Sequence, residues 1–168
     1  MAELLGGGTR RTGMIDTAGG RLRAGLVSWG NNTFPYIDAK SRQIVMGKPG
    51  QSYQIRLENR SRRRQEVVVS VDGLNVLTGG AATYSQRGYV INPKSAVTID
   101  GFRVNDDKVR RFEFSSVAAS KAAQQGQDRN VGVVGLAVFE EDEAKATMML
   151  RKEQFQREDA SAFPVSGR

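Results

Sequence analysis

Apolar and polar residues alternate along the middle of the chain with a period of two, as in a strand with one buried and one solvated face. The clearest run covers residues 53–58, where Tyr53, Ile55 and Leu57 hold the apolar positions. Residues 66–71 repeat the pattern with β-branched side chains. Both runs predict β-strands whose apolar faces belong to a common core.

Turn signals divide much of the remaining chain into further short strands. Asp72-Gly73 predicts a tight hairpin turn into residues 74–77, and residues 92–95 predict a second hairpin between strands at 88–91 and 96–99. About eight such strands, joined by turns that contain Gly, Asn and Asp, are typical of sandwiches and jelly rolls. The sequence therefore predicts an all-β fold, an antiparallel β-sandwich or jelly roll.

Two segments depart from this alternation. Residues 131–139 are apolar at nearly every position, which predicts a central strand buried on both faces, with Gly132 and Gly135 permitting close backbone approach. Residues 116–125 are rich in alanine, begin with serine and end before Gly126. They predict one short helix.

The two ends of the chain differ from the middle in composition. Residues 1–24 combine glycine runs with arginine and show no periodicity, which predicts a flexible N-terminal arm. Residues 25–143 form the predicted sandwich domain, and residues 144–168 form a charged C-terminal tail. Because an arm of this kind is too polar to fold alone, we expect both ends to be extended and to order against a partner.

Residue types that carry much of enzyme chemistry are missing from the 168 residues. The chain has neither His nor Cys, which excludes Ser-His-Asp and Cys-His catalysis and zinc sites built on those ligands. The carboxylates at 106–107 and 140–143 are interpreted as solvated loops. We therefore predict a protein that is not an enzyme, with no catalytic residue, no cofactor and no metal. No secretory signal or membrane-spanning apolar run is visible, which predicts a soluble protein.

The net charge of +7 is unevenly placed along the chain. Residues 1–64 hold twelve Lys or Arg against four Asp or Glu. Arg favours bidentate contacts with carboxylates and phosphates, so this half predicts an acidic partner, either protein or nucleic acid. The densest cluster lies at 60–64, where aromatic residues that could stack on bases are scarce. That scarcity favours an exposed loop or a protein contact over nucleic acid.

Three aromatic residues, Trp29, Phe34 and Tyr36, lie between the predicted arm and the clear β pattern. They either anchor the arm to a partner, as interface aromatics do, or cap the sandwich. Together with the arginines of the basic half they complete the set of predicted partner-binding residues, which is Arg10, Arg11, Arg21, Arg23, Trp29, Phe34, Tyr36, Arg60, Arg62, Arg63 and Arg64.

Four segments, 67–79, 87–90, 101–103 and 130–140, resemble a family of small bacterial and prophage-type proteins of unassigned activity. The most distinctive string is Ser-Val-Asp-Gly-Leu-Asn-Val at 70–76. The resemblance covers about residues 50–141, leaves both ends outside, and implies a shared β fold with no catalytic residues to transfer.

A β domain with a Gly- and Arg-rich arm and a charged tail also resembles accessory virion proteins, which dock on a capsid or tail lattice. We therefore expect a capsid decoration or other accessory virion protein of a tailed bacteriophage, assembled in the host cytoplasm and located in the virion. Its expected partners are the lattice and further copies of itself, with no membrane. Two alternatives remain: a bacterial cytoplasmic β-sandwich module that binds a carbohydrate-type ligand, and a nucleic-acid-binding protein that uses residues 60–64.

Overall fold

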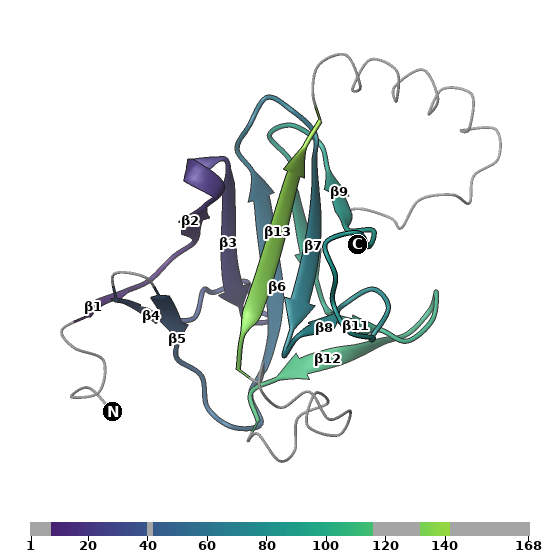
Figure 1. Ribbon diagram of the computed structural model, residues 1–168. Helices are drawn as coiled ribbons and strands as arrows, with labels where there is room; N and C mark the ends of the chain where they lie inside the picture. The colour runs from purple at the N-terminus through teal and green to yellow at the C-terminus, as the bar shows by residue number, and fades with distance from the viewer. Residues whose placement is uncertain (1–7, 40–41, 116–131, 142–168) are drawn as a thin grey trace.

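The computed structural model describes residues 8–39, 42–115 and 132–141. Strands make up nearly all of its regular structure, which confirms the all-β prediction (Figure 1). In chain order the elements are β1 (Thr9–Arg11), β2 (Ile15–Thr17), the 3-10 turn η2 (Ala18–Gly20), β3 (Leu22–Val27), β4 (Tyr36–Ala39), β5 (Arg42–Val45), β6 (Ser52–Asn59), β7 (Gln65–Val71), β8 (Leu74–Asn75), β9 (Tyr89–Ile91), β10 (Ala96–Ile99), β11 (Gly101–Arg103), β12 (Val109–Glu113) and β13 (Val134–Glu140).

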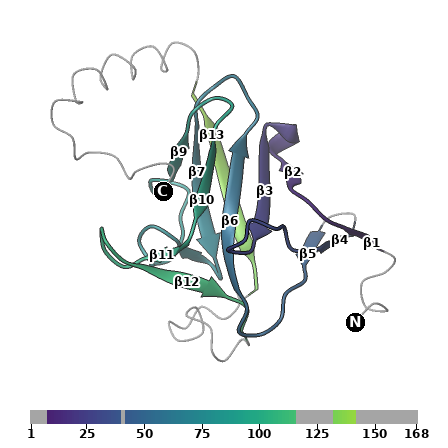
Figure 2. The ribbon, with the colours of Figure 1, turned by 180° about the vertical axis from the view of Figure 1, so that it is seen from behind.

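These strands form three antiparallel sheets. The largest has the order β11-β12-β6-β3-β2, with β10 also paired to β6. The second has the order β13-β7-β8, with β9 also paired to β7. The two sheets lie face to face as the layers of a sandwich, and a small third sheet, β1-β4-β5, lies at the side of β2 and β3 (Figures 1 and 2).

The core fills the space between β6 and β7, as the alternating pattern predicts. Ile55 and Leu57 from β6, and Val67 and Val69 from β7, are at most 1% exposed. Burying each such side chain contributes about 1.5–3 kcal/mol. The ring of Phe112, from β12, stacks on another core aromatic, that of Tyr53, with centroids 5.3 Å apart. The two residues also face each other in the register that joins β12 to β6. Figure 1 shows β12 at the lower end of the sandwich.

The predicted hairpin at Asp72-Gly73 is confirmed. Asp72 and Gly73 both have positive φ, 56° and 77°, as a type I′ turn requires, and Val71 pairs with Leu74 across the turn. The predicted hairpin at 92–95 is wrong, because β9 pairs with β7 while β10 pairs with β6. Both strands carry buried residues at alternate positions, so the chain crosses from one layer to the other to bury each set.

The prediction of a central strand at 131–139 is wrong. Within the described residues β13 pairs only with β7, so it lies at the edge of its sheet. Val134 and Phe139 remain 38% and 45% exposed. One face of β13 packs its Leu136 and Val138 against the core, and the apolar residues of the other face meet solvent.

The predicted arm boundary after residue 24 also needs correction. It cuts through β3, which pairs with β6 along its whole length from Leu22 to Val27. Leu22 is 0% exposed, and β2 pairs with β3 ahead of it. Glycine and arginine dominate the composition here, yet the short apolar set at Leu22, Ala24 and Leu26 is enough to form a strand against the core. Three predicted segments lie outside the described residues: the first part of the arm (1–7), the helix at 116–125 and the tail at 144–168.

Candidate interaction surfaces

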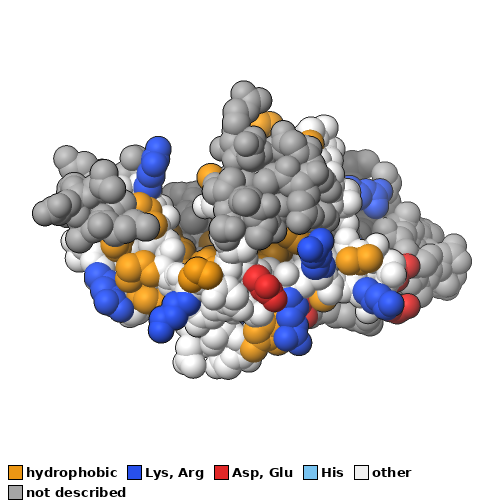
Figure 3. All heavy atoms as spheres, turned by 90° about the horizontal axis from the view of Figure 1, so that it is seen from below, with side chains coloured by type: hydrophobic (Ala, Val, Ile, Leu, Met, Phe, Trp, Pro, Cys, Tyr) orange, Lys and Arg blue, Asp and Glu red, His pale blue; other side chains and the backbone are white. Residues whose placement is uncertain are grey.

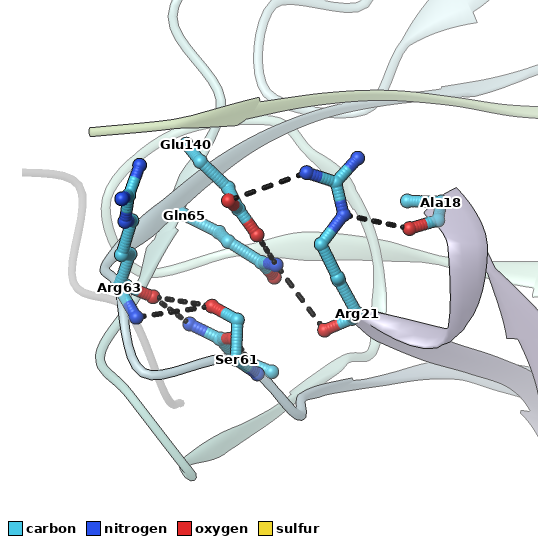
Figure 4. Close-up of polar contacts among 7 residues, drawn as sticks. Ala18, Arg21, Ser61, Arg63, Gln65 and Glu140 are labelled. Carbon is cyan, nitrogen blue, oxygen red and sulfur yellow. Dashed lines mark hydrogen bonds and ion pairs between the residues drawn. The ribbon is translucent and has the colours of Figure 1, made fainter. Parts of the chain in front are cut away.

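The connection between β6 and β7, at the upper end of the sandwich in Figure 1, holds the arginine cluster in a fixed loop. Asn59 organises it from inside, because its buried amide donates to the backbone oxygens of Arg63 (2.8 Å) and Ile91 (2.9 Å). Its side-chain oxygen accepts from the backbone N–H of Ser61 at 2.9 Å. Ser61 also donates its hydroxyl to the Arg63 carbonyl, so the loop is held from two sides (Figure 4).

Arg64 does not belong to this exposed loop. It is 9% exposed, and its guanidinium donates to one oxygen of Glu141 through Nε at 2.8 Å and through Nη2 at 2.7 Å. The prediction that Arg64 binds a partner is therefore corrected, since it joins the start of β7 to the end of β13. Glu140 and Glu141 were expected to be solvated, but their side chains are only 17% and 19% exposed.

Arg21, the residue before β3, takes part in a second polar contact with the end of β13. Its guanidinium lies 3.4 Å from a carboxylate oxygen of Glu140 and donates to the carbonyl of Ala18 at 2.9 Å (Figure 4). The fully buried amide of Gln65 donates to the other carboxylate oxygen of Glu140 at 3.1 Å and to the Arg21 carbonyl at 3.2 Å. Arg21 thus connects the η2 turn to the end of β13 at the upper end of the sandwich.

Four cations remain exposed at this end with no ion pair to any described residue: Arg60, Arg62, Arg63 and Lys94. The ammonium of Lys94 reaches the loop and donates to the carbonyl of Arg60. The β6–β7 loop and the β9–β10 crossing are also joined by a backbone bond from Asn59 to Ser95. We call these four residues the cationic end. Sequence reasoning missed Lys94, because only the crossing between layers brings it beside Arg60.

The arginines of the predicted arm do not join the cationic end. Arg11 lies 3.4 Å from the carboxylate of Asp38, and Arg23 lies 2.9 Å from that of Asp16. Each pair links neighbouring strands of the chain itself. Arg10 is exposed on β1 and has no ion pair to a described residue. The structure therefore scatters the predicted set over different parts of the surface.

The three candidate aromatics have two different environments. Phe34 and Tyr36 are 8% exposed, and the ring of Phe34 meets that of Phe114 edge-on at 5.3 Å. Both side chains are therefore buried in this chain, and Phe34 belongs to its main core cluster. Trp29 is 46% exposed, and the guanidinium of Arg111 lies 4.2 Å from its ring centroid. Sequence reasoning missed this partner, which comes from β12.

The surface around Trp29 lies at the opposite end of the sandwich from the cationic end. There β3 ends at Val27, and the β11–β12 hairpin leaves Val104 and Val109 63% and 48% exposed. Figure 3 views this end and shows Lys and Arg side chains spread among apolar ones. Charged and apolar side chains are interspersed on this surface, whereas the cationic end gathers its charges at one place.

A cleft of about 700 Å³ opens between the layers beside β13. Its walls come from β3 and β5 on one side and from β13 on the other, with Tyr53 and Ile55 of β6 among the lining residues. Most of the lining is apolar, and its charged members are Arg42, Asp72 and Glu113. No sequence pattern indicated this cleft, because it depends on how far β3 and β5 extend past the edge of the opposite layer.

Two buried phenols have shifted acidity. Burial raises the pKa of Tyr89 to about 12, while the charge of Arg103 opposes the shift and that of Asp100 adds to it. Burial, with a smaller contribution from the charge of Asp72, raises the pKa of Tyr53 far above its ordinary value. Both shifts arise because the interior disfavours a phenolate.

We predict from these shifts that the domain loses stability at alkaline pH. The folded state favours the neutral phenol, so the contribution of Tyr89 is complete below pH 10, the ordinary pKa, and is lost as the pH rises from 10 towards 12. Urea unfolding at pH 8, 10 and 11 should show this fall in the free energy of unfolding. The Tyr89→Phe variant should fall less steeply, and an identical slope in both proteins would show the attribution to be wrong.

Comparison with known proteins identifies no relative of the chain. No family model matches the chain, and neither a curated protein nor a solved structure shows significant similarity to it. Residues 8–39, 42–115 and 132–141 contain no group of three or more side chains that could hold a metal ion. None of the helices in this part of the chain is long and apolar enough to cross a membrane.

Proposed function

We propose that the chain is a non-enzymatic interaction protein that binds an acidic protein surface through its cationic end. A preorganised loop suits this role, because a backbone that is already ordered loses less entropy when a partner binds. Three of the four cations are Arg, whose planar guanidinium makes paired hydrogen bonds to carboxylates.

The observation that carries the proposal is the crowding of four exposed cations without a described acid on one fixed end of the sandwich. Along the strands, Arg11, Arg23 and Arg56 each face an acid of the same chain. At the cationic end, four exposed cations face none among the described residues, and the loop beneath them is fixed by the buried Asn59. Like charges crowded on a rigid loop repel one another, so an acidic partner would relieve that repulsion.

The setting that we propose for this interaction is a virus particle. The resemblance of segments within 67–140 to prophage-type proteins supports an accessory virion protein of a tailed bacteriophage, such as a capsid decoration protein. In that setting the partner is the lattice of the capsid or tail, and the chain reaches it after assembly in the host cytoplasm. A protein that acts in the bacterial cytoplasm is the other setting in which the same surface would serve.

We predict that a triple variant, Arg60→Ser, Arg62→Ser and Arg63→Ser, binds purified particles more weakly than the wild type in a co-sedimentation assay, by about threefold to about a hundredfold. Exposed ion pairs contribute about 0.2–1 kcal/mol each, so three of them give an effect of that order. The matched control replaces Arg10, Arg87 and Arg110 by Ser, and all three are exposed. It removes the same charge from positions elsewhere and should bind as the wild type does.

Equal weakening of both triple variants would mean that net charge alone governs binding, against the proposal. The same assay with random duplex DNA tests the nucleic-acid alternative. DNA binding that falls steeply with salt and is lost only in the first variant would favour that alternative over a protein partner. Among the exposed aromatics, Trp29, Tyr84 and Phe139, the predicted partner-binding Trp29 lies at the opposite end and adds no stacking surface to these arginines.

A further inference from the structure

The strand β13 has backbone groups with no strand beside them. The backbone N–H of Asp72 donates to the carbonyl of Val133, and that of Glu141 to the carbonyl of Arg64. In the antiparallel register with β7, these bonds assign the odd-numbered residues of β13 to the hydrogen-bonded pairs. The N–H and C=O groups of Val134, Leu136 and Val138 therefore point away from β7, and no described strand pairs with that edge.

The sequence of this edge also lacks the charges and prolines that usually keep strand edges from pairing. Folded proteins protect free edges with charges, prolines or bulges. Residues 133–139 contain neither a charged residue nor a proline, and Glu140 at the end is engaged by Arg21 and Gln65. Val133, Val134 and Phe139 are each more than a third exposed. An edge of this composition is suited to a strand partner.

The cleft lies along the same edge. Ala24 and Leu26 of β3 and Ile44 and Val45 of β5 line it opposite Leu136 of β13. In both ribbon views β3 runs beside β13 in the other layer (Figures 1 and 2), and within the described residues no strand of the β13 layer covers the part of β3 that lines the cleft. An added strand about 4.8 Å from β13 would lie over this uncovered part.

The shape and charge of the cleft define what fits there. The charged groups of its lining, Arg42, Asp72 and Glu113, sum to only −1, so a strongly charged segment has little to bind. A second copy that paired through its own β13 would also bring the layer that contains its β2 and β3. That layer extends past the edge in both copies, so it would collide with β2 and β3 of the first. A single extended segment needs the width of one strand.

We propose that β13 and the cleft bind an extended segment of a protein partner as an added β-strand. Its backbone would pair with Val134, Leu136 and Val138, and its alternate apolar side chains would enter the cleft. Main-chain hydrogen bonds supply most of the affinity in this mode, and the pockets for alternate side chains supply the specificity. The site shares no residue with the cationic end, so either proposal can fail without the other.

The test uses the full chain and a capped nine-residue peptide that alternates valine and threonine, with a lysine at each end for solubility. Calorimetry measures the affinity of the peptide, and hydrogen exchange by NMR follows the amides of Val134, Leu136 and Val138. We expect a Kd below about 1 mM, which corresponds to about 4 kcal/mol of binding free energy. We also expect exchange of the three amides to slow by about tenfold or more when the site is occupied.

Two variants block the site in different ways. Val134→Pro removes an N–H that the domain does not use, and Ala24→Phe fills the cleft from β3. Each should weaken peptide binding by about tenfold or more. Phe139→Ser is the matched control, because position 139 lies on the other face of β13 from Leu136 and Val138, which pack against the core. Thermal melts confirm that each variant is folded.

Four results would overturn the proposal. The first is a peptide that does not bind, and the second is equal binding to the wild type and to both folded variants. The third is protection of the three amides in the dilute protein alone, which would mean that another part of this chain occupies the edge. The fourth is protection that grows with protein concentration, which would mean that a second copy does.

Discussion

Deletion of residues 1–24 is expected to leave a chain that does not fold. The deletion removes β1, β2 and the first half of β3, and with them the pairing of Leu22, Arg23 and Ala24 to β6. Leu22 is completely buried in the main core cluster. Loss of one such side chain costs about 2–5 kcal/mol, which is a large part of the 5–15 kcal/mol that stabilises a typical domain.

Circular dichroism and thermal unfolding of the chain 25–168 measure this effect. We expect no cooperative melt, whereas deletion of residues 1–7, which removes none of the pairing described above, should leave the melt intact. The point variant Leu22→Ala should lower the free energy of unfolding by about 2–5 kcal/mol, and the exposed Arg10→Ala by less than about 0.5 kcal/mol. A cooperative melt of the chain 25–168 close to that of the full chain would show that this segment is an appended arm.

Breaking the Arg64–Glu141 pair is expected to be the most destabilising polar change. Both side chains are largely buried, and two nitrogens of Arg64 bond one oxygen of Glu141. Removal of one partner leaves a buried charge without its counterpart, which costs about 3–5 kcal/mol. We expect Arg64→Met and Glu141→Leu each to fall in this range in urea unfolding.

The double variant distinguishes the free energy contributed by the ion pair from the cost of leaving one charged side chain without its partner. Arg64→Met together with Glu141→Leu removes both charges, so it should be far less destabilising than the sum of the single variants. The exposed pair Arg23–Asp16 serves as the comparison, for which we expect about 0.2–1 kcal/mol. If Arg64→Met were as mild as the loss of that surface pair, Arg64 could not be a structural residue, and its assignment to the partner-binding set would return.

Local alternation was sufficient to predict the centre of the fold. The strands at 53–58 and 66–71 and the turn at Asp72-Gly73 were correct, because each depends on neighbouring residues. The first half of β3 was assigned to the arm because glycine and arginine mask its apolar residues Leu22 and Ala24. The crossing between β9 and β10 was missed for a different reason, since two strands separated by a short polar turn have the same local pattern whether they pair or change layers.

The candidate site was predicted only in part. Arg60, Arg62 and Arg63 stand out in the sequence as a charge cluster, and the structure leaves them exposed. Arg64 belongs to the same cluster in sequence, yet its partner lies 77 residues away in the chain. Pairings over such distances depend on how the sheets assemble, so no local pattern distinguishes the buried arginine from the exposed ones. The cleft beside β13 follows from the same long-range arrangement.

The charge distribution connects the fold to the proposed function. A buried asparagine and a buried ion pair fix the ends of β6, β7 and β13, and this fixed end presents four cations to solvent. A particle lattice with an acidic patch would be a suitable partner. The strand site at β13 would add a second, apolar contact to the same or another protein.

The central claim is that this chain is a structural component that docks on the lattice of a virus particle. Quantitative mass spectrometry of virus particles purified from cells that produce this chain tests the claim most directly. We predict a fixed copy number per particle that survives repeated purification and is markedly lower when residues 60, 62 and 63 are changed to Ser. Absence of the chain from the particles, or an unchanged copy number in that variant, would contradict the account.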